Sequence, residues 1–528
     1  MESMSPAIVL LCLVAAADST VIVESQGRDS QSIAAAIARV KPGDTVRLPE
    51  GTFELSEPIR PKSGIKLLGA GQEKTRLLYK GDKPGSFICL NGCEDMEIAH
   101  MTLDGQNNPL VYQGIEGSNS RRLRLHHLTI RDLQAKTWGP HAILFSGRNP
   151  TLEGGVTDSR ISDCRIENIG PESEWGGGIR LAWGSAGNEV IGNTIHNTGR
   201  GGIFGDHSPE LIIRNNRVSG SRGEGLGIEV WGHSDRAVIE NNRIDHWLSI
   251  GGSDFCAVRR NVISDKSGSV KFIGIEGIGA HCIYTDNVVD GGQQIGLSVS
   301  NNTPKDFAYW GYNRVENCVQ WASQFQGETT GIAYHYFYRC TLGNTLRGDP
   351  RARYPNDSGH GLRTNGACRA LVFEDCAFQN NGGYGLQLGG TQVDALTFLR
   401  CTITGNGQAA VTGPSQYTAM EFNGCKVEGN KDDRLPAAKP FPSPPPVADF
   451  RLSEPVQAGR AAQFQCNSRA AGGIVGRLWD FGDGIPEVTE QPHHAFGQPG
   501  KYRVTLVVWN KSGRGGRVEK MIQVLPSP

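Results

Sequence analysis

Charged residues are scarce in this sequence of 528 residues, making up 20% of it against about 25% in an average soluble domain. The formal net charge is −1 and no run of lysine or arginine occurs, so the electrostatic basis for binding a phosphate backbone is missing. Beyond the N-terminus, no stretch approaches the ~20 consecutive apolar residues of a membrane-spanning helix. These shortages exclude nucleic acid as an expected partner and predict a chain without a transmembrane anchor.

The N-terminal segment carries an apolar core from Ala7 to Val14, followed by three alanines that suit signal peptidase, although no basic residue precedes it. We interpret residues 1–17 as a signal peptide. The mature chain is therefore expected to be secreted, periplasmic or at the cell surface.

Glycine is abundant, with 70 residues, and two nearly identical phrases occur, IIRNNRVSG from Ile212 and VIENNRIDH from Val238. Similar text, alternating apolar and polar residues with a period of two, recurs about every 27 residues, as expected of strands in a solenoid. Alignment on the second asparagine gives one position per repeat: His100, His127, Cys164, Asn193, Asn216, Asn242, Asn261, Asn287, Asn313, Cys340, Cys376, Cys401 and Cys425.

Rungs of a β-solenoid stack about 4.8 Å apart, so identical amides at one inward bend can hydrogen-bond along the column. We prefer this structural role for Asn216 and Asn242 to a catalytic one. Cysteines in the same column are expected to pack as small apolar residues, without disulfides. The close spacing of Cys89 and Cys93 leaves a local disulfide open, and a zinc site is not expected because no second Cys/His pair accompanies them.

The segment SQSIAAAIARVKPGDTVRLPEG from Ser30, followed by these repeats, resembles the N-terminal cap and first rungs of right-handed parallel β-helix proteins of the pectate-lyase-like superfamily. The resemblance implies an all-β coil over residues 25–430, capped by an amphipathic helix near residues 32–40 that covers the open sheet edge. This superfamily includes polysaccharide lyases, glycoside hydrolases, uronan epimerases and phage tail-spikes, so the fold does not select a reaction.

A proline-rich stretch, PAAKPFPSPPP, lies within residues 431–446 and is interpreted as a semi-rigid linker. The text after it, including LWDFGDG from Leu478 and GKYRVTLVVWN from Gly500, resembles a PKD domain over residues 447–528. The resemblance implies a small immunoglobulin-like β-sandwich that serves as a spacer or a surface contact.

One strand per repeat carries the candidate chemistry. Alternation places Ile179, Ile203, Ile228, Leu248 and Ile273 inward, which predicts that the side chains between them stack on the outer face. The resulting candidates for catalysis are Arg180, Asp206, Glu229, Lys271 and Glu276, and those for substrate binding are Trp183, His207, Trp231, His233, Arg363 and Asn365. Inserts at residues 147–157, 171–176 and 346–358 are expected to wall a groove on this face.

Two reactions are open at this face. If Asp206 and Glu229 stand on adjacent rungs, about 5 Å apart, they suit a retaining hydrolase, whereas a wider separation suits an inverting one. A lyase instead needs a cation beside a uronate, supplied by Arg180, Lys271, Arg363 or a calcium ion held by acids, together with a base. His207 and His233 are candidates for proton transfer, although histidine at such a corner more often hydrogen-bonds within the turn.

We therefore predict an exported, monomeric, polysaccharide-active enzyme, hydrolase or lyase. Calcium is the one cofactor under consideration. The alternative is a non-catalytic extracellular rod with a glycan-binding or partner-binding face. A groove with converging acid and base groups favours the enzyme, and a flat stripe favours the rod.

Overall fold

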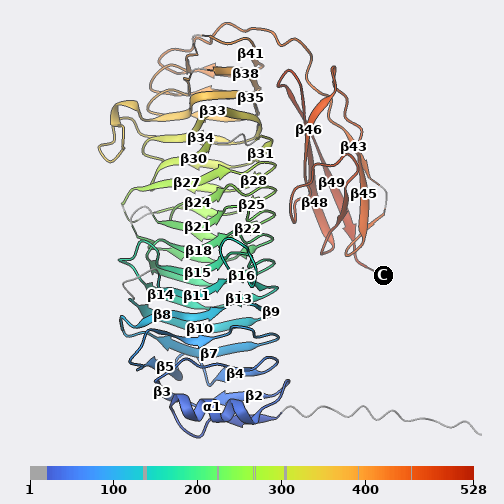
Figure 1. Cartoon of the computed structure of the whole chain (residues 1–528). Coiled ribbons are helices and arrows are strands. Elements are labelled where there is room, and N and C mark those ends of the chain that lie inside the picture. The colour runs from blue at the N-terminus through green and yellow to red at the C-terminus, as the bar shows by residue number, and fades with distance from the viewer. Residues whose placement is uncertain are drawn as a thin grey trace, which may run out of the picture.

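The computed structural model of the chain describes residues 21–134, 139–222, 225–265, 267, 269–301, 306–390, 392–414, 416–452 and 455–527. The predicted signal peptide lies outside these residues. Parallel strands wind into a tall coil with a separate small β-sandwich beside it (Figure 1). No helix among the described residues is long and apolar enough to span a bilayer.

A single helix, α1 (Ser30–Arg39), covers the N-terminal end of the coil (Figure 1). Asp29 caps it by accepting a hydrogen bond from the backbone N–H of Ser32 at 2.7 Å. Ile33, Ala36 and Ile37 are buried against the first strands. The predicted cap helix is thus present, beginning two residues earlier than the apolar pattern indicated.

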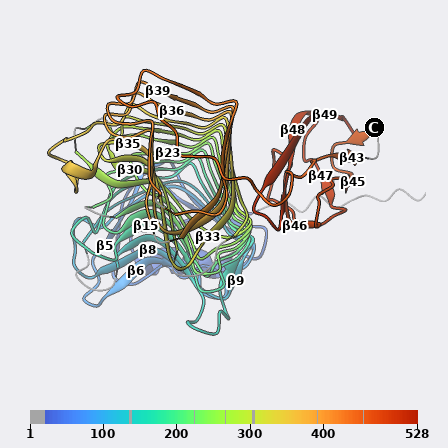
Figure 2. The ribbon, with the colours of Figure 1, turned by 90° about the horizontal axis from the view of Figure 1, so that it is seen from above.

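Each turn of the coil contributes strands to three parallel sheets, seen end-on in Figure 2. The first, named the site sheet, consists of β6 (Gly85–Cys89), β8 (Val111–Gly117), β11 (His141–Ser146), β15 (Gly177–Ala182), β18 (Gly201–Asp206), β21 (Leu226–Trp231), β24 (Leu248–Gly251), β27 (Lys271–Ile278), β30 (Gln293–Asn301), β33 (Trp321–Tyr338), β35 (His360–Glu374), β37 (Leu386–Leu388) and β40 (Val411–Thr412).

The second, named the docking sheet, consists of β1 (Ile22–Glu24), β2 (Thr45–Leu48), β4 (Lys66–Gly69), β7 (Glu97–Asp104), β10 (Arg124–Leu133), β13 (Arg160–Ser162), β16 (Glu189–Ile191), β19 (Ile212–Arg214), β22 (Val238–Glu240), β25 (Ala257–Arg259), β28 (Ile283–Thr285), β31 (Ala308–Gly311), the later parts of β33 and β35, β38 (Gln392–Leu399) and β41 (Met420–Asn423).

The third sheet consists of β3 (Gly51–Leu55), β5 (Thr75–Tyr79), the later parts of β7 and β10, β14 (Arg165–Ile169), β17 (Thr194–Thr198), β20 (Arg217–Ser219), β23 (Arg243–Ile244), β26 (Val262–Ile263), β29 (Val288–Asp290), β32 (Arg314–Glu316), β34 (Thr341–Gly343), β36 (Ala377–Gln379), β39 (Thr402–Thr404) and β42 (Lys426–Glu428). The short strands β9 (Ser120–Arg121) and β12 (Val156–Thr157) pair with each other, and a 3₁₀ turn, η1, spans Pro355–Asp357.

The asparagine ladder lies at the bend between the docking sheet and the third sheet. From Asn193 through Asn313, each side-chain Nδ2 donates to the next Oδ1 at 3.0–3.1 Å, which confirms the structural interpretation. The preceding residues, Asn215 and Asn241, have φ of 59° and 57°, a conformation that asparagine tolerates better than most residues. The repeated asparagine pair therefore combines a left-handed corner with a ladder rung.

The predicted column was wrong in its first two rungs. His100 and His127 have φ of 61° and 50° and occupy the corner position, one residue before the ladder. The ladder position is taken by Met101 and Leu128, which are opposite each other and fully buried. Because apolar residues replace asparagine at this position, the repeated asparagine phrase could not align these two rungs with the others.

All twelve cysteines within the described residues are free thiols, and eleven of them are buried. Cys89 and Cys93 do not form the disulfide that their spacing left open. The Sγ of Cys93 contacts the carbonyl oxygen of Pro61 at 3.5 Å, and Arg60 donates to the Sγ of Cys89 at 3.0 Å. The two thiols thus have separate partners.

The C-terminal module is a β-sandwich of two sheets with its own aromatic core around Trp479. One sheet contains β43 (Phe450–Leu452), β45 (Ala461–Cys466) and β47 (His493–Ala495), and the other contains β44 (Val456–Gln457), β46 (Ile474–Asp480), β48 (Gly500–Asn510) and β49 (Gly515–Leu525).

The module lies against the docking sheet rather than away from the coil (Figures 1 and 2). Leu478, Val507 and Trp509 share a buried apolar cluster with residues of the coil that include Tyr309 and Tyr336. At its edge, Arg259 Nη2 lies 2.8 Å from Asp480 Oδ1, with only 1% and 6% of the two side chains exposed. The module, expected to follow a semi-rigid linker as a spacer or a surface contact, thus packs on the coil itself.

Candidate active site

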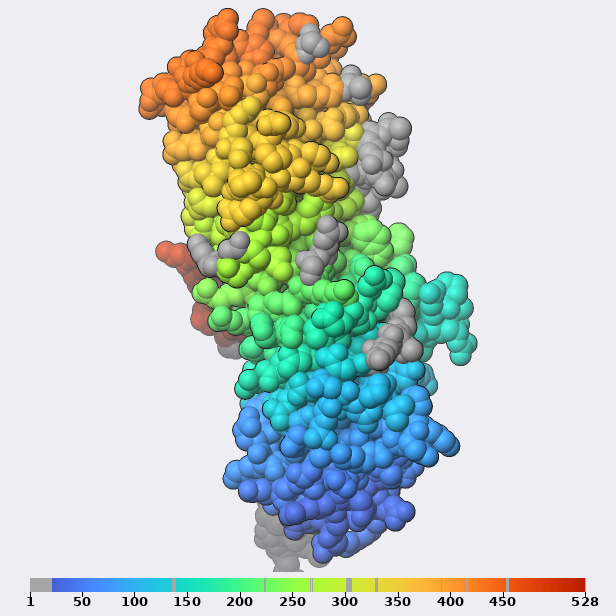
Figure 3. Space-filling view, turned by 90° about the vertical axis from the view of Figure 1, so that its left-hand side faces the viewer, coloured from blue at the N-terminus to red at the C-terminus, as the bar shows by residue number. Residues whose placement is uncertain are grey.

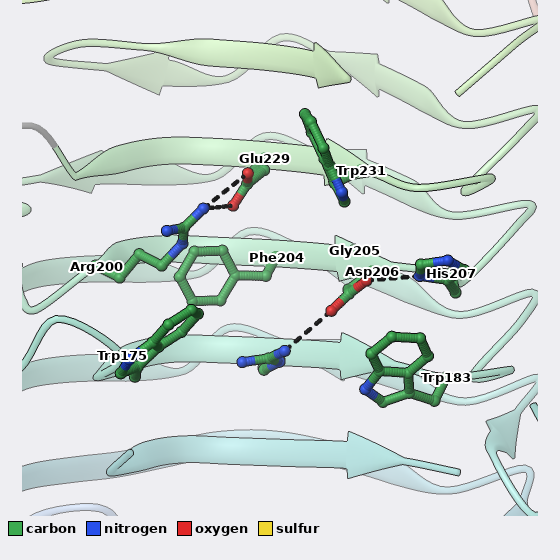
Figure 4. Close-up of a pocket in the computed structure, with 10 residues that line it drawn as sticks. Trp175, Trp183, Arg200, Phe204, Gly205, Asp206, His207, Glu229 and Trp231 are labelled. Atoms are coloured by element: carbon green, nitrogen blue, oxygen red, sulfur yellow. Dashed lines mark hydrogen bonds and ion pairs between the residues drawn. The ribbon is translucent and has the colours of Figure 1, made fainter. Parts of the chain in front are cut away.

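A pocket of about 330 Å³ opens on the outer face of the site sheet, across β15, β18 and β21 (Figure 4). Its lining consists of Trp175, Arg180, Trp183, Arg200, Phe204, Gly205, Asp206, His207, Glu229 and Trp231. We name it the first pocket. Six of the residues predicted from the sequence thus converge at one place: Arg180, Trp183, Asp206, His207, Glu229 and Trp231.

Strand register explains this convergence. Arg180 is opposite Phe204 on the next rung, and Phe204 is opposite Glu229 on the rung after that. Two residues further along these strands, Asp206 is opposite Trp231. Since Ile179, Ile203 and Ile228 are fully buried in the core, these neighbours face outward as predicted. Asp206 and Glu229 stand on adjacent rungs but are offset by two residues along the strands.

The offset changes the expected separation of the carboxylates. A rung spacing of about 4.8 Å and two residues of about 3.3 Å each place the two Cα atoms about 8 Å apart. That is wider than the expected 5 Å for residues directly opposite each other. Because both side chains extend outward from these backbone positions, the offset favours the ~6.5–9.5 Å carboxyl separation typical of inverting glycosidases over the ~5 Å of retaining ones.

The two carboxyl groups have different environments. Asp206 accepts a hydrogen bond from Arg180 Nη2 at 2.9 Å, and its other oxygen lies 2.8 Å from His207 Nδ1. Burial raises the pKa of the Glu229 carboxyl, and it outweighs the opposing effect of Arg200, whose Nη2 lies 3.1 and 3.2 Å from the two carboxyl oxygens. Both carboxyls therefore pair with an arginine, and Glu229 differs in that burial raises its pKa, so it retains its proton to higher pH than an ordinary glutamate.

Aromatic side chains border the carboxyls on both sides. In Figure 4, Trp175 and Arg200 lie at one end of the pocket, and Trp231, His207 and Trp183 lie at the other. Trp175 and Trp231 are 42% and 49% exposed, which leaves apolar ring area open to a ligand. Trp175 comes from the predicted insert at residues 171–176, which confirms that this insert walls the site.

Histidines 207 and 233 follow their strands at left-handed corners, with φ of 53° and 58°. His207 stacks on Trp183 at a centroid distance of 4.5 Å and lines the pocket through its contact with Asp206. His233 is exposed and does not line the pocket, so its predicted role in this site is not supported by its position.

Two predicted catalytic residues lie elsewhere. Lys271 is opposite Gln293 near the start of β27, five residues before Glu276, and does not reach the pocket. Glu276 lies two rungs above Glu229 in the same column, where it accepts hydrogen bonds from Ser249 Oγ at 2.7 Å and Trp247 Nε1 at 3.1 Å. Burial raises the pKa of Glu276 as well.

The inward prediction for Ile273 was also wrong in register. Leu248 is opposite Ile275, not Ile273, because β27 begins four residues before the position that pairs with Leu248. Ile273 instead packs with Ile295 and Trp321 in a small separate cluster.

Arg200 was missed from the sequence. It stands one residue before β18 in a Gly-Arg-Gly-Gly run, where no alternation of apolar residues predicts which face of the sheet a side chain occupies. Arg363 and Asn365 do lie on the site sheet, but they line a different pocket further along the coil.

The sequence left open a calcium ion held by acidic side chains at this face. Among the described residues, no three His, Cys, Asp or Glu side chains are grouped so that they could hold a metal ion.

A coil of three parallel sheets with a docked β-sandwich defines the class of protein. The family model described as right handed beta helix region matches residues 85–263 and 160–346, and that for the PKD domain matches residues 443–524. The chain therefore contains a right-handed β-helix region and a C-terminal PKD domain.

Among curated proteins, the chain is 28% identical over 231 residues to the pre-neck appendage protein of Bacillus phage phi29, covering 40% of this chain and 27% of that protein. The preneck appendage protein of Bacillus phage PZA matches at 27% identity over the same length. The chain thus spans about a quarter of the length of these relatives.

Two solved structures illustrate the similarity of the coil. The catalytic unit of a GH87 α-1,3-glucanase from Streptomyces thermodiastaticus is 14% identical, with a TM-score of 0.44 over 76% of this chain and 70% of that chain. A mannuronan C-5 epimerase A-module from Azotobacter vinelandii is 13% identical, with a TM-score of 0.38 over 78% and 97% of the two chains. Neither match says which reaction this chain carries out.

Proposed function

We propose that the chain is an exported glycoside hydrolase that acts on a polysaccharide bound along the site sheet, with the first pocket as its reaction centre. The observation that carries this proposal is the pair of carboxyls in one pocket, Asp206 held by Arg180 and His207, and Glu229 with a pKa that burial raises despite its pairing with Arg200. Such a division is what a general base and a general acid need at one operating pH.

In this mechanism, Glu229 donates its proton to the glycosidic oxygen as the bond to the anomeric carbon breaks. Asp206 accepts a proton from a water molecule whose oxygen forms the new bond to that carbon from the opposite face. The offset of the two carboxyls leaves room for this water, so the product is expected to have inverted anomeric configuration.

The remaining pocket residues position these groups. Arg180 and His207 hold the two oxygens of Asp206, and Arg200 holds Glu229. Exposed rings of Trp175 and Trp231 offer stacking surfaces for pyranose units on either side of the cleaved bond.

The test is a screen of the purified protein against neutral and uronate-containing polysaccharides, following reducing ends and ultraviolet absorbance together. Hydrolysis gives reducing ends without the absorbance of an unsaturated sugar, and it should be lost in both Glu229→Gln and Asp206→Asn. Unsaturated products would replace the hydrolase by a lyase. Glycan binding without turnover on the whole panel would favour the non-catalytic rod.

A further inference from the structure

A second pocket, of about 370 Å³, opens on the same sheet, across β30, β33 and β35. Its polar lining includes Gln324, Gln326, Arg353, Arg363 and Asn365, and Tyr354 contributes a ring that is 51% exposed. The predicted insert at residues 346–358 supplies Arg353, Tyr354 and Asp357, and it projects from the front of the coil in Figure 3.

The insert is held in a defined position over the sheet. Trp321 Nε1 donates to the carbonyl oxygen of Asp357 at 2.9 Å, and Gln294 Nε2 donates to that of Arg351 at 2.7 Å. Gln294 also accepts a hydrogen bond from the backbone N–H of Arg353 at 2.9 Å. The second pocket is therefore preformed.

Its charge balance is positive. Asp357 is engaged by Arg363 at 3.4 Å, His360 at 3.1 Å and Gln387 at 2.9 Å. Arg353 lies over two rings, those of Phe272 and Tyr354, at 5.8 and 5.7 Å, and we find no ion pair for it among the described residues. One guanidinium is thus left for an anionic ligand, because Asp357 already neutralises the other.

The two pockets are connected by one continuous column of outward side chains. Glu229, Ser249, Glu276, Ser298, Gln324 and Arg363 follow one another rung by rung. From β18 to β33 there are five rung steps, or about 24 Å. Glu276 lies midway, and since burial raises its pKa, it opposes an anionic chain less than an ordinary glutamate does.

We propose that the second pocket is a distal subsite that binds an anionic sugar unit, carboxylated or sulfated, of the same polymer that occupies the first pocket. The anionic group pairs with Arg353, hydroxyls bond to Gln324, Gln326 and Asn365, and an apolar sugar face stacks on Tyr354. The inference rests on the proposed function for the glycan in the first pocket. It names the substrate class as an acidic polysaccharide long enough to span both pockets.

The test is calorimetric titration of the full chain carrying Glu229→Gln, so that binding is measured without turnover. The probes are short and long size fractions of polygalacturonate and alginate, the same fractions with their carboxyls reduced to alcohols, and chondroitin sulfate. Long acidic fractions of at least one polymer should bind more tightly than short ones. Arg353→Gln should weaken the long fractions about tenfold or more, as expected for a lost charge-assisted hydrogen bond, without affecting the short ones.

Arg347→Gln is the matched control, because Arg347 is an exposed arginine of the same insert that does not line the pocket. It should bind like the parent. Equal binding of reduced and acidic fractions, equal loss in both arginine variants, or no dependence on length would each overturn the inference. Tight binding of chondroitin sulfate but not of the same polymer after desulfation would assign the anion as sulfate. Length-dependent acidic binding in a protein without hydrolytic activity would retain the subsite and refute the hydrolase.

Discussion

Replacing Asn242 by alanine tests the ladder on which the coil depends. The side chain is fully buried and makes four hydrogen bonds: Oδ1 accepts from the N–H and Nδ2 of Asn216 at 2.9 and 3.1 Å, and Nδ2 donates to the Ile213 carbonyl at 2.9 Å and to Asn261 Oδ1 at 3.0 Å. Alanine removes all four. The Asn216 N–H then has no acceptor at this bend.

An orphaned buried N–H costs about 1–3 kcal/mol, and each of the other three bonds contributes about 0.5–1.5 kcal/mol. Because neighbouring groups share the loss, we expect a fall of about 3–5 kcal/mol in the free energy of unfolding. Guanidinium unfolding followed by both circular dichroism and tryptophan fluorescence measures it, and coincidence of the two curves checks that the coil unfolds as one unit.

Asn241→Gly is the matched control for this measurement. Asn241 is exposed and has φ of 57°, which glycine adopts freely, so the variant should lose less than about 1 kcal/mol. If Asn242→Ala were no more destabilised than this control, the ladder would not be what holds the bend, and the reasoning above would fail.

Three further predictions concern other parts of the molecule. Glu229→Gln should lower kcat by about 10²–10⁴. In the parent, kcat/KM should fall as the pH rises through the raised pKa of Glu229, because only the protonated carboxyl can act as the acid. A Gln variant whose kcat/KM still falls over this alkaline range would contradict the assignment. Arg259→Met leaves Asp480 buried without its ion-pair partner, which weakens the docking of the module by about 3–5 kcal/mol. Proteolysis of the linker within residues 434–446 should therefore accelerate. Arg243→Met, at an exposed arginine, should leave the rate of proteolysis unchanged. Of the twelve cysteines in the described residues, the native protein should expose at most Cys425 to a thiol reagent, because the other eleven are buried, and burial also raises the pKa of the Cys164 thiol to about 12. Rapid labelling of several of these thiols, or a Cys89–Cys93 disulfide found by mass, would contradict this.

Features that repeat in every rung were predictable from the sequence. The period of about 27 residues, the inward isoleucines and the asparagine column all follow from side-chain direction, because each rung places the same position in the same environment. That is why six of the eleven predicted site residues meet in the first pocket. A second ladder, in which Asn381, Asn406 and Asn430 bond at 3.0 and 2.6 Å, was missed because it lies at another bend, outside the aligned phrase.

Features that depend on where repeats depart from regularity were not predictable. Ile275 rather than Ile273 is opposite Leu248, because β27 begins four residues before this pair, and Gln324 rather than Gln326 is opposite Arg363. Contacts across the chain, such as Arg259 with Asp480, join residues 221 apart and leave no local pattern. Sequence alternation sets which side of a strand a residue faces, whereas the neighbours it meets depend on insert lengths.

Docking of the PKD domain has a consequence for the second pocket. The long strands β33 and β35 run from the site sheet into the docking sheet, so each carries pocket residues near its start and module contacts near its end. Gln324 and Arg363 line the pocket, while Tyr338 lies under the Arg517 guanidinium at 3.2 Å and Glu374 pairs with Arg517 at 3.3 Å. The first pocket, on β15, β18 and β21, has no such strands in common with the module. If Arg259→Met loosens the module, it should therefore weaken the binding of long acidic chains more than the turnover of short substrates. An equal effect on both would show that docking of the module does not stabilise the second pocket through β33 and β35.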